Sequence, residues 1–386
     1  MTVYRFEEIA HNISDKKMPV PGDEKTYIGL EHLDTGSLQV TRWGQDVVLT
    51  GEKLIMKKGD ILFGRRNTYL RRAAIAPHDG IFSAHCMIFR PKTDVIDAEF
   101  FPFFISSDYF IDEAIKISVG SLSPTVNWGT LKKLEFDLPS MEEQKRLAKI
   151  LIAAEETRQA YKKLIKQTDD LINAKFIELF VLNNSDECYK KSLQELIDKK
   201  WITYHLDGNH GGDYPRSDEF VESGVPYISA NCIADGVVDM RFAKYVTKER
   251  AQRFRKGIAQ NGDVLFAHNA TVGPVALLKT TEPVVVLGTS LTAFRCDTKH
   301  IIPEYLMSFM KHPMFINQYE SDMQQTTRKQ VPITTQRKYN FIIPPVEKQK
   351  VFADFVQQAE QTKIATQQSL YALNETVRAL VNRNFN

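Results

Sequence analysis

The stretch LPSMEEQKRLAKIL at residues 138–151 returns in altered form as IPPVEKQKVFADFV at residues 343–356. Both copies fit the pattern Pro-x-x-Glu-x-Gln-Lys, and a long segment without proline follows each of them. Proline is accepted in the first turn of a helix but not in its interior, so each copy predicts the start of a long helix. The occurrence of one such opening twice in a chain indicates an internal repeat.

Other landmarks repeat in the same order. TYIGLEHLDTGSL (26–38) corresponds to PYISANCIADGVV (226–238), and KGDILFGRR (58–66) corresponds to NGDVLFAHN (261–269). The two copies are separated by 200, 203 and then 205 residues along the chain, as small loop insertions would cause. A repeat of this size is far longer than the unit of a solenoid, so the sequence predicts two domain-sized copies.

The first part of each copy alternates short β-branched and aromatic runs with Gly, Asp, Asn and Pro, the pattern of strands joined by turns. The predicted strands are DILFG, AAIAP and IFSAHCMIF in the first copy, and DVLFA, PVALLK and PVVVLGTSLTAF in the second. Residues 100–116 and 303–320 occupy corresponding places and are each predicted to form a helix. We therefore expect a mixed α/β head with a curved sheet in each copy.

The second part of each copy carries apolar or small residues in steps of three and four, which predicts an amphipathic helix of ~38 residues, roughly 57 Å long. Lys363 and Thr366 interrupt the stripe of the second helix. A lone helix of this length needs a partner, and the other copy would give an antiparallel coiled coil. The alternative is that each helix folds back onto its own head. The predicted packing residues are Leu147, Ile150, Leu151, Ala154, Tyr161, Leu164, Ile165, Leu171, Ile172, Phe352, Val356, Ala359, Leu370, Leu373, Val377 and Leu380.

These patterns define the expected fold class. It is α/β (α+β), with two tandem mixed α/β heads, two long helices in an antiparallel coiled coil and a pseudo-two-fold internal repeat. The predicted division is a first head at 1–138, a central long helix at 139–182, a second head at 183–343 and a C-terminal long helix at 344–386.

The composition is that of an ordinary globular protein, with 43% hydrophobic and 25% charged residues and a net charge of +2. Since the whole chain is nearly neutral, any basic surface must come from local clusters. The four cysteines, Cys86, Cys188, Cys232 and Cys296, lack metal-ligand spacing and are expected to be reduced thiols. Without an apolar signal core or a run of ~18 apolar residues, we expect a soluble, cytoplasmic protein.

The sequence contains no convincing active site. It lacks the phosphate-binding G-x-x-x-x-G-K-[ST] and G-x-G-x-x-G patterns, H-E-x-x-H and G-x-S-x-G. It also lacks the Asn-Pro-Pro-aromatic stretch that an amino-methyltransferase of DNA would use. DGNHGGD (207–213) could cradle a phosphate, but a surface loop is the plainer interpretation. We predict no catalytic residue and no metal site.

Local charge favours nucleic-acid binding. RRNTYLRR (65–72) places four arginines in eight residues, and arginine can pair with guanine or phosphate while asparagine pairs with adenine. A solvated basic face is the alternative. The matching stretch AHNATVGPV (267–275) has no arginine, so two heads that share one scaffold would recognise different targets.

Two further polar segments, 118–134 and 322–339, precede the long helices and are rich in groups that donate to phosphates and base edges, although an ordinary polar loop is the alternative. The predicted DNA-binding residues are Arg65, Arg66, Asn67, Tyr69, Arg71, Arg72, Ser123, Thr125, Asn127, His268, Asn269, Thr271, Gln324, Gln325, Thr326, Thr327, Arg328 and Lys329.

The tandem heads, the GDILF and GDVLF landmarks and the two Pro-x-x-Glu-x-Gln-Lys openings resemble the specificity (S) subunits of type I restriction–modification systems, over essentially the whole chain. The resemblance implies that each head is a target recognition domain for one half of a bipartite, asymmetric DNA sequence, with the helices setting the gap. It also implies a non-catalytic subunit that docks two methyltransferase (M) subunits as well as restriction (R) subunits.

The same resemblance implies no cofactor in this chain, because S-adenosylmethionine, ATP and Mg are used by the partner subunits. Two alternatives stay open. One is a specificity-like subunit of a methylation-only or other defence system, and the other is a coiled-coil scaffold whose heads bind proteins. An enzyme that itself cuts or methylates DNA is disfavoured by the missing motifs.

Overall fold

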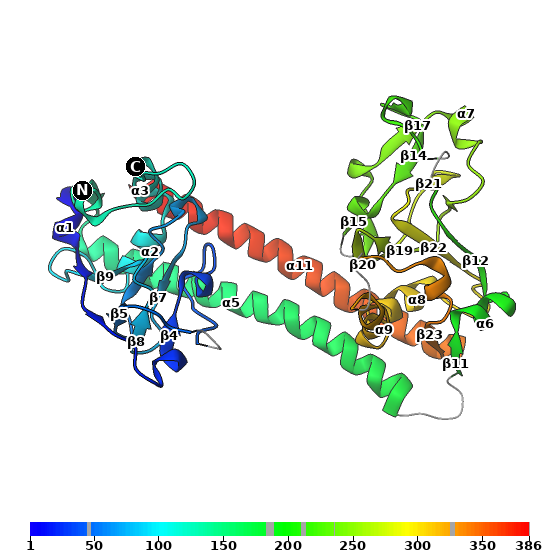
Figure 1. Ribbon diagram of the computed structural model, residues 1–386, viewed down its shortest axis with the longest axis horizontal. Helices are drawn as coiled ribbons and strands as arrows, with labels where there is room; N and C mark the ends of the chain where they lie inside the picture. The colour runs from blue at the N-terminus through cyan, green and yellow to red at the C-terminus, as the bar shows by residue number, and fades with distance from the viewer. Residues whose placement is uncertain (45–47, 183–188, 210–213, 235, 325–328, 386) are drawn as a thin grey trace. The chain divides into compact units, whose positions relative to one another are not determined.

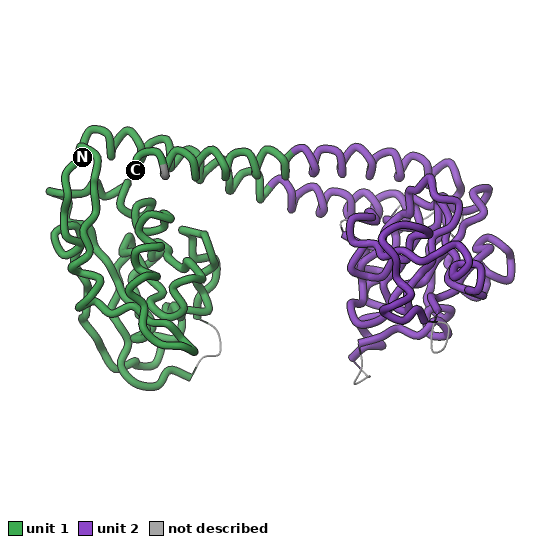
Figure 2. The backbone as a smooth tube through the Cα atoms, turned by 90° about the horizontal axis from the view of Figure 1, so that it is seen from above, with its two compact units in different colours: residues 1–163, 366–386 green, residues 164–365 purple. Residues whose placement is uncertain are grey.

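The computed structural model describes residues 1–44, 48–182, 189–209, 214–234, 236–324 and 329–385 (Figure 1). The chain divides into two compact units, residues 1–163 with 366–386 (unit 1) and residues 164–365 (unit 2), as Figure 2 shows. Each unit holds one mixed α/β head and one part of each long helix, α5 (Met141–Ile177) and α11 (Val346–Phe385). The four-part division made from the sequence stays a prediction.

The described residues of unit 1 form three sheets. The first is antiparallel, with strands in the order β2 (Ala10–Ile13), β9 (Met87–Pro91), β6 (Ile61–Phe63) and β7 (Ala73–Ile75). The second has the order β3 (Lys16–Lys17), β5 (Lys53–Met56), β8 (Gly80–Phe82) and β4 (Tyr27–Ile28), of which β4 and β8 are parallel. The third pairs β1 (Thr2–Arg5) with β10 (Glu135–Leu138), so the first strand lies beside the strand that leads into α5.

Unit 2 repeats this plan with additional strands in its described residues. Its largest sheet has the order β12 (Ile202–Asp207), β22 (Leu291–Cys296), β19 (Val264–Asn269), β20 (Thr271–Leu277), β16 (Val237–Val238) and β15 (Ile233–Ala234). A second sheet has the order β13 (Phe220–Val221), β17 (Lys244–Val246), β14 (Val225–Ile228), β21 (Val285–Leu287) and β18 (Ile258–Ala259). The third pairs β11 (Tyr189–Ser192) with β23 (Asn340–Ile343), which lead into the head and into α11.

Several short helices cover these sheets. In unit 1 they are α1 (Phe6–Ile9), α2 (Phe101–Ser106), α3 (Asp108–Lys116) and α4 (Trp128–Leu131). In unit 2 they are α6 (Leu193–Asp198), α7 (Lys248–Ala251), α8 (Pro303–Met310), α9 (Pro313–Met323) and α10 (Ile333–Gln336).

The prediction of one helix at 100–116 and one at 303–320 is wrong, because each region contains two helices. Ser107 has extended backbone and its hydroxyl accepts a hydrogen bond from the Phe110 N–H, so it caps α3. His312 caps α9 in the same way, and Pro313 follows it. An N-cap needs non-helical backbone, so the helix is interrupted at the same place in both copies.

A buried glutamine accounts for the repeated helix opening. The Oε1 of Gln144 accepts a hydrogen bond from the Asp97 N–H at 2.8 Å, and its Nε2 donates to the Pro139 carbonyl at 2.9 Å. Gln349 makes the equivalent bonds in unit 2 at 2.9 and 2.7 Å. Each glutamine thus joins the first turn of a long helix to the segment that precedes the short helices of its head, α2 in unit 1 and α8 in unit 2. A side chain with both a donor and an acceptor satisfies the buried backbone groups on both sides.

The GDILF and GDVLF landmarks each contain a buried carboxylate. Asp60 accepts hydrogen bonds from Nε and Nη2 of Arg90 at 2.7 and 2.8 Å. Asp263 accepts the same pair from Arg295, at 2.8 Å each. Since Arg90 lies on β9 and Arg295 on β22, this two-pronged ion pair joins a turn to an inner strand of the main sheet in each unit.

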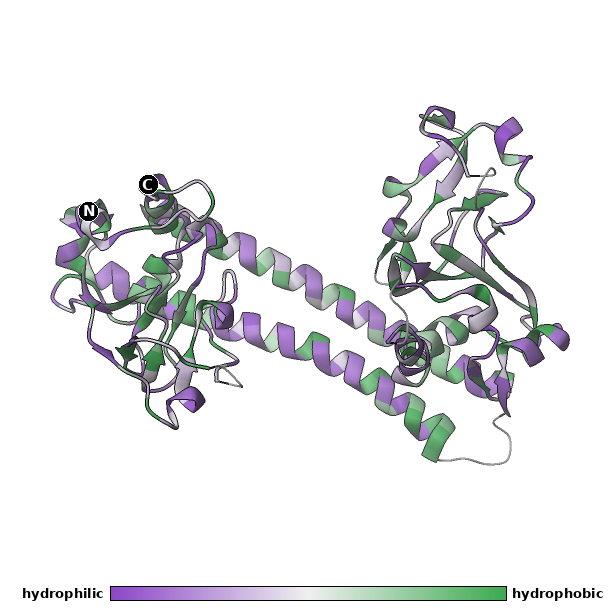
Figure 3. Ribbon diagram, in the orientation of Figure 1, coloured by the Kyte–Doolittle hydropathy of each residue, from purple (hydrophilic) through white to green (hydrophobic). Residues whose placement is uncertain are grey.

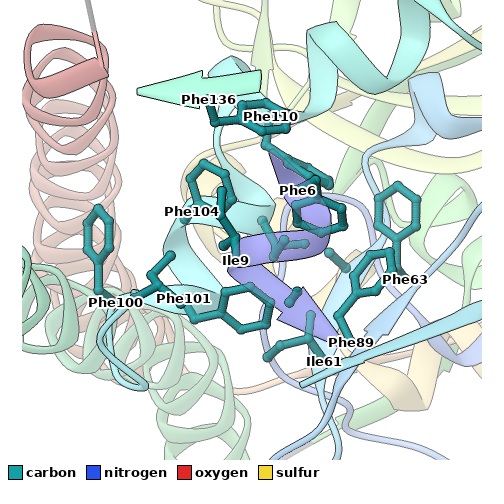
Figure 4. Close-up of a cluster of buried hydrophobic side chains, with 14 of the residues drawn as sticks. Phe6, Ile9, Ile61, Phe63, Phe89, Phe100, Phe101, Phe104, Phe110 and Phe136 are labelled. Carbon is teal, nitrogen blue, oxygen red and sulfur yellow. The ribbon is translucent and has the colours of Figure 1, made fainter. Parts of the chain in front are cut away.

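The core of unit 1 is a cluster of phenylalanines (Figure 4). The Phe6 ring lies 5.1 Å from that of Phe89 and 5.0 Å from that of Phe110, in the edge-on and tilted arrangements that aromatic rings prefer. The long helices belong to the same core. The helix residues in it or packed against it are Leu147, Ala148 and Leu151 from α5, and Val377, Leu380 and Val381 from α11.

In unit 2 the opposite ends of the helices meet. Phe176 near the end of α5 and Phe180 in the π-helical turn that follows (Glu178–Leu182) pack with Phe352 near the start of α11, with ring centroids 5.4–5.6 Å apart. The start of α5 thus packs with the end of α11 in unit 1, and the reverse holds in unit 2. This arrangement confirms the predicted antiparallel helix pair, and the alternative of separate helices is wrong.

The predicted packing stripe was too broad. Ile150, Leu164 and Leu171 are 40%, 42% and 55% exposed, so their assignment to the packing face was wrong. A helix pair buries only a narrow seam, and these residues lie beside it; Figure 3 shows hydrophilic and hydrophobic residues alternating along both helices. The buried members of the prediction are Leu147, Leu151, Phe352 and Val356. The half-buried members are Ala154, Tyr161, Ile165, Ile172, Ala359, Leu370, Leu373, Val377 and Leu380.

Polar residues occupy part of the seam. Thr168 and Thr366 are each 7% exposed, so Thr366 is on the packing face that the sequence indicated it would interrupt. The Lys363 ammonium group binds the Asp169 carboxylate at 2.7 Å within unit 2. In unit 2, an ion pair therefore joins the two long helices in addition to their apolar contacts.

We predict that Gln144→Leu destabilises unit 1 by about 3 kcal/mol, because the buried backbone groups that Gln144 binds lose their partners. Hydrogen exchange of the α2 amides measures the loss. Gln167→Leu, at an exposed position of the same helix, is the control and should change stability by less than about 0.5 kcal/mol. Equal effects of the two substitutions would contradict this role for Gln144.

Candidate DNA interface

The two polar segments of unit 1 lie side by side. The Asn67 N–H donates to the Pro124 carbonyl at 2.7 Å, and the Val126 N–H donates to the Arg65 carbonyl at 2.9 Å. Arg66 and Thr125 form an antiparallel bridge between these bonds. Residues 65–72 and 118–127, here called loop pair 1, therefore make one surface although they are far apart in the sequence.

The same juxtaposition occurs in unit 2. Asn269 and Gln330 form an antiparallel bridge, and the Val331 N–H donates to the His268 carbonyl at 2.8 Å. Residues 267–271 and 329–331 are called loop pair 2. Four predicted DNA-binding residues lie outside the described residues, namely Gln325, Thr326, Thr327 and Arg328.

Loop pair 1 presents several of its predicted residues to solvent. Arg66, Asn127 and Tyr69 are exposed, the last to 56%. The Arg65 guanidinium group donates to Asn127 Oδ1 at 3.1 Å, so one residue from each segment is joined at the surface. The half-buried members are Arg65, Asn67, Arg72, Ser123 and Thr125.

Arg71 and Asn67, two of the predicted residues, direct polar atoms toward the protein. Arg71 donates from Nη1 to Asp108 and from Nη2 to Asp112, at 2.6 Å each. Asn67 Oδ1 is buried and accepts no hydrogen bond within the described part of the chain. Two carboxylates already bind the Arg71 guanidinium group, and the contact of Arg71 with DNA stays a prediction.

Loop pair 2 and the segment before it carry different side chains from those of loop pair 1. Thr271, Gln324 and Lys329 are exposed, and Asn269 is half-buried. His268 is only 5% exposed, so its predicted contact with DNA is wrong. Successive side chains of a strand point to opposite faces, and His268 on β19 points inward where Asn269 does not.

His268 belongs to a buried polar network beneath loop pair 2. Its Nδ1 lies 2.9 Å from the Thr292 hydroxyl, to which Gln336 Nε2 donates at 3.1 Å. The same Nε2 donates to the Val331 carbonyl at 3.0 Å, and Gln336 Oε1 lies 3.1 Å from His205 Nε2. The network thus joins three strands and α10 to the backbone of loop pair 2. Because the residues of this network are dispersed along the chain, no local sequence pattern could have revealed the network.

Sequence reasoning also missed a basic turn in unit 2. KERAQRFRK (248–256) holds five basic residues in nine, a density visible in the sequence. Arg250 and Lys256 each bind a carboxylate at 2.6 Å. Lys248, Arg253 and Arg255 are exposed, and neither Arg253 nor Arg255 forms an ion pair with any described residue. This turn offers positive charge to a phosphate backbone.

Within the described ranges, no group of three or more His, Cys, Asp or Glu side chains is arranged to hold a metal ion. In the same ranges, no helix has both the length and the apolar character needed to cross a bilayer. Cys86, Cys232 and Cys296 are free thiols, and burial raises the pKa of Cys86 to about 12. Cys188 is outside the described residues.

The chain belongs to the family of type I restriction modification DNA specificity domains, whose family model matches residues 1–168 and 192–375. These two ranges are the two copies of the internal repeat. Family membership makes the chain a specificity subunit of a type I restriction–modification system and confirms the resemblance seen in the sequence.

Named relatives agree with this assignment. The specificity subunit of the type I restriction enzyme MjaVIII of Methanocaldococcus jannaschii is 20% identical over 361 residues, covering 91% of this chain and 84% of that protein. The MjaIX specificity subunit of the same organism is 27% identical over 173 residues, covering 42% of this chain and 36% of that protein.

Solved structures share the fold. One is the type I restriction–modification S subunit of M. genitalium, with a TM-score of 0.59 and 14% identity over 100% of this chain and 96% of that one. Another comes from work on complex assembly and conformational transition of the type I R-M system, with a TM-score of 0.60 and 17% identity over 100% of this chain and 97% of that one. Both confirm the two-headed fold class.

We predict that acid weakens unit 2 through His205, because burial lowers the pKa of this residue to about 4 from an ordinary 6.5. Between these two values the unfolded chain binds a proton that the folded chain does not. The contribution of uncharged His205 to the stability of unit 2 is therefore fully present above about pH 6.5. It falls as the pH drops towards 4, by up to about 1.4 kcal/mol per pH unit.

Hydrogen exchange of the β12 and β22 amides between pH 4 and 7, corrected for intrinsic exchange, measures this slope. His205→Asn should flatten it, because asparagine does not titrate. His11→Asn, at an exposed position of unit 1, is the control and should leave it unchanged. A slope that persists in His205→Asn would assign the pH dependence to other groups.

Proposed function

We propose that this subunit selects DNA by reading a bipartite, asymmetric sequence, with one half-site for each head. The observation that carries the proposal is the loop pair, which both heads build with the same backbone bridges. The scaffold is common, whereas the side chains at its tip differ. Arg65 and Arg66 in unit 1 correspond to His268 and Asn269 in unit 2.

The chemistry of the exposed tips suits direct base reading. Arginine offers a forked donor that matches the O6 and N7 atoms of guanine, and asparagine offers the donor and acceptor that match adenine. Both loop pairs extend from sheets whose turns are held by Asp–Arg ion pairs with a buried carboxylate. A rigid support of this kind keeps base-reading groups in place before DNA arrives.

The long helices are proposed to set the gap between the half-sites. α5 has 37 residues and α11 has 40, and each runs from one unit into the other without interruption by proline. Two reading heads must meet the same side of a duplex at a defined spacing, and a continuous helix pair is stiff enough to define one.

The chemistry of modification and cleavage is proposed to belong to partners. We propose that the chain is non-catalytic and docks two methyltransferase subunits and restriction subunits in the cytoplasm. S-adenosylmethionine, ATP and Mg²⁺ would be used by those partners. This proposal rests on family membership and on the absence of methyltransferase and nucleotide-binding motifs from the sequence.

A methylation map of the host, with and without the gene, tests the proposal. We expect deletion to abolish methylation at one split adenine-containing motif. Substitution of Arg65 and Arg66 by alanine should alter only one half of that motif, and substitution of Asn269 and Thr271 only the other half. A map unchanged by deletion would contradict DNA selection and would favour a protein-binding scaffold.

The basic turn is expected to contact phosphates rather than bases. We predict that alanine at Lys248, Arg253 or Arg255 weakens binding of the full complex to all DNA sequences alike. Each change should reduce the slope of log K against log salt by about 0.9, because one fewer counterion is released. Lys299→Ala, at an exposed position elsewhere in unit 2, should leave the slope unchanged. A loss confined to one target sequence would contradict a phosphate contact.

A further inference from the structure

Loop pair 1 contains a turn with unusual backbone. The single 3-10 turn Thr68–Leu70 is flanked by Asn67 at φ 53° and by Arg71 at φ 51°. Both are left-handed conformations that residues other than glycine rarely adopt and that cost free energy. Such a turn persists only when its surroundings hold it, and the side-chain contacts of Arg71 are among those that do.

The contacts of Arg71 converge on Asp108. One oxygen of the Asp108 carboxylate accepts Nη1 of Arg71 at 2.6 Å, and the other accepts Nε of Arg378 on α11 at 3.0 Å. Among the described residues Asp112 forms an ion pair with Arg71 only, and it is 54% exposed, against 28% for Asp108. Asp108 therefore lies between two guanidinium groups and joins the turn to α3 and to α11, all within unit 1.

The second head has a residue with positive φ at the corresponding position, but no ion pair is made by its side chain, because it is a glycine. Strand pairing aligns Ile61–Ile75 of β6 and β7 with Val264–Leu277 of β19 and β20. This alignment places Gly273, at φ 122°, where unit 1 has Arg71. A glycine adopts positive φ at little cost and needs no external support. At the positions equivalent to Asp108 and Arg378, given the 205-residue repeat, the chain has Pro313 and Asn173.

From these contacts we infer that Asp108 is a positioning residue for sequence reading by the first head, acting through Arg71 and linked to the C-terminal helix by Arg378. This inference rests on the proposed function and deepens it. Arg71 is then a structural arginine, while the exposed Arg66 and Tyr69 and the half-buried Arg65 are left to meet DNA. The end of α11, remote in sequence, becomes part of the reading apparatus of the first head.

The test uses the full chain assembled with its methyltransferase partners. Methylation rates are measured on duplexes that carry single base changes in one half-site or the other. Asp108→Asn removes the charge while keeping the shape, and it leaves two guanidinium groups facing each other. We expect roughly a tenfold loss of discrimination at the half-site read by the first head, as for a lost charged hydrogen bond, and no change at the other.

Arg71→Gly gives the sharper result. Glycine accepts the left-handed backbone unaided, as Gly273 does in the second head, so this variant should keep its discrimination. The double variant Arg71→Gly with Asp108→Asn should also keep it, which amounts to rescue of Asp108→Asn. Asp112→Asn is the matched control and should change discrimination less than twofold, because Asp108 still holds Arg71.

Three results would overturn the inference. They are full discrimination in Asp108→Asn, equal losses at both half-sites, and a loss in Arg71→Gly as large as in Asp108→Asn, which would make Arg71 a DNA contact. If the unaltered complex discriminates at neither half-site, the proposed function fails instead. The two failures are thus distinguishable in one set of reactions.

Discussion

Burial of a narrow apolar seam on two long helices is the constraint on which the rest of this structure depends. Neither α5 nor α11 has enough apolar surface to be stable alone, since isolated helices gain little from propensity. Each unit completes the seam with its own core, built on phenylalanines in both units. The helix ends and the heads therefore fold as shared cores, and the buried Gln144 and Gln349 fix where each helix begins.

The two copies of the repeat share their buried polar contacts but differ in the side chains of their loop pairs. Both copies keep the glutamine tie, the Asp–Arg ion pair and the capped break between two short helices. All of these lie in or near the cores, where an unpaired polar group is costly. The loop pairs lie at the surface, where a change of side chain leaves the cores intact. A scaffold of this kind can change what it reads without changing how it folds.

The two heads also hold their loops by different means. The turn of loop pair 1 leans on an ionic contact with Asp108, which is partly open to solvent. Loop pair 2 stands on the buried network of Gln336, Thr292 and two histidines. The first support depends on charge and is open to screening by salt, whereas the second depends on neutral hydrogen bonds and on an uncharged His205. We therefore expect the heads to differ in their response to salt and pH as well as in their side chains.

Much of the architecture could be predicted from the sequence, because the internal repeat and the helix opening are local patterns. They yielded two mixed α/β heads and the antiparallel helix pair, and local composition marked the arginine-rich and polar segments as candidates for DNA binding. Periodicity could not separate the seam from its neighbours, so Ile150, Leu164 and Leu171 were assigned to a face that they do not occupy. The apolar periodicity of one helix does not show how wide a face its partner helix will cover.

The roles of individual polar residues were decided by the tertiary structure. Arg71 and His268 look like DNA contacts in the sequence, but one is bound by two carboxylates and the other is buried. The partners responsible, Asp108, Arg378, Thr292 and Gln336, are distant along the chain and come together only in the folded units. The sequence by itself determined the family, the repeat and the long helices, since these rest on local and periodic patterns. Only the tertiary structure decided which charged and polar groups are free to meet DNA, because that depends on which partners the fold brings within hydrogen-bonding distance.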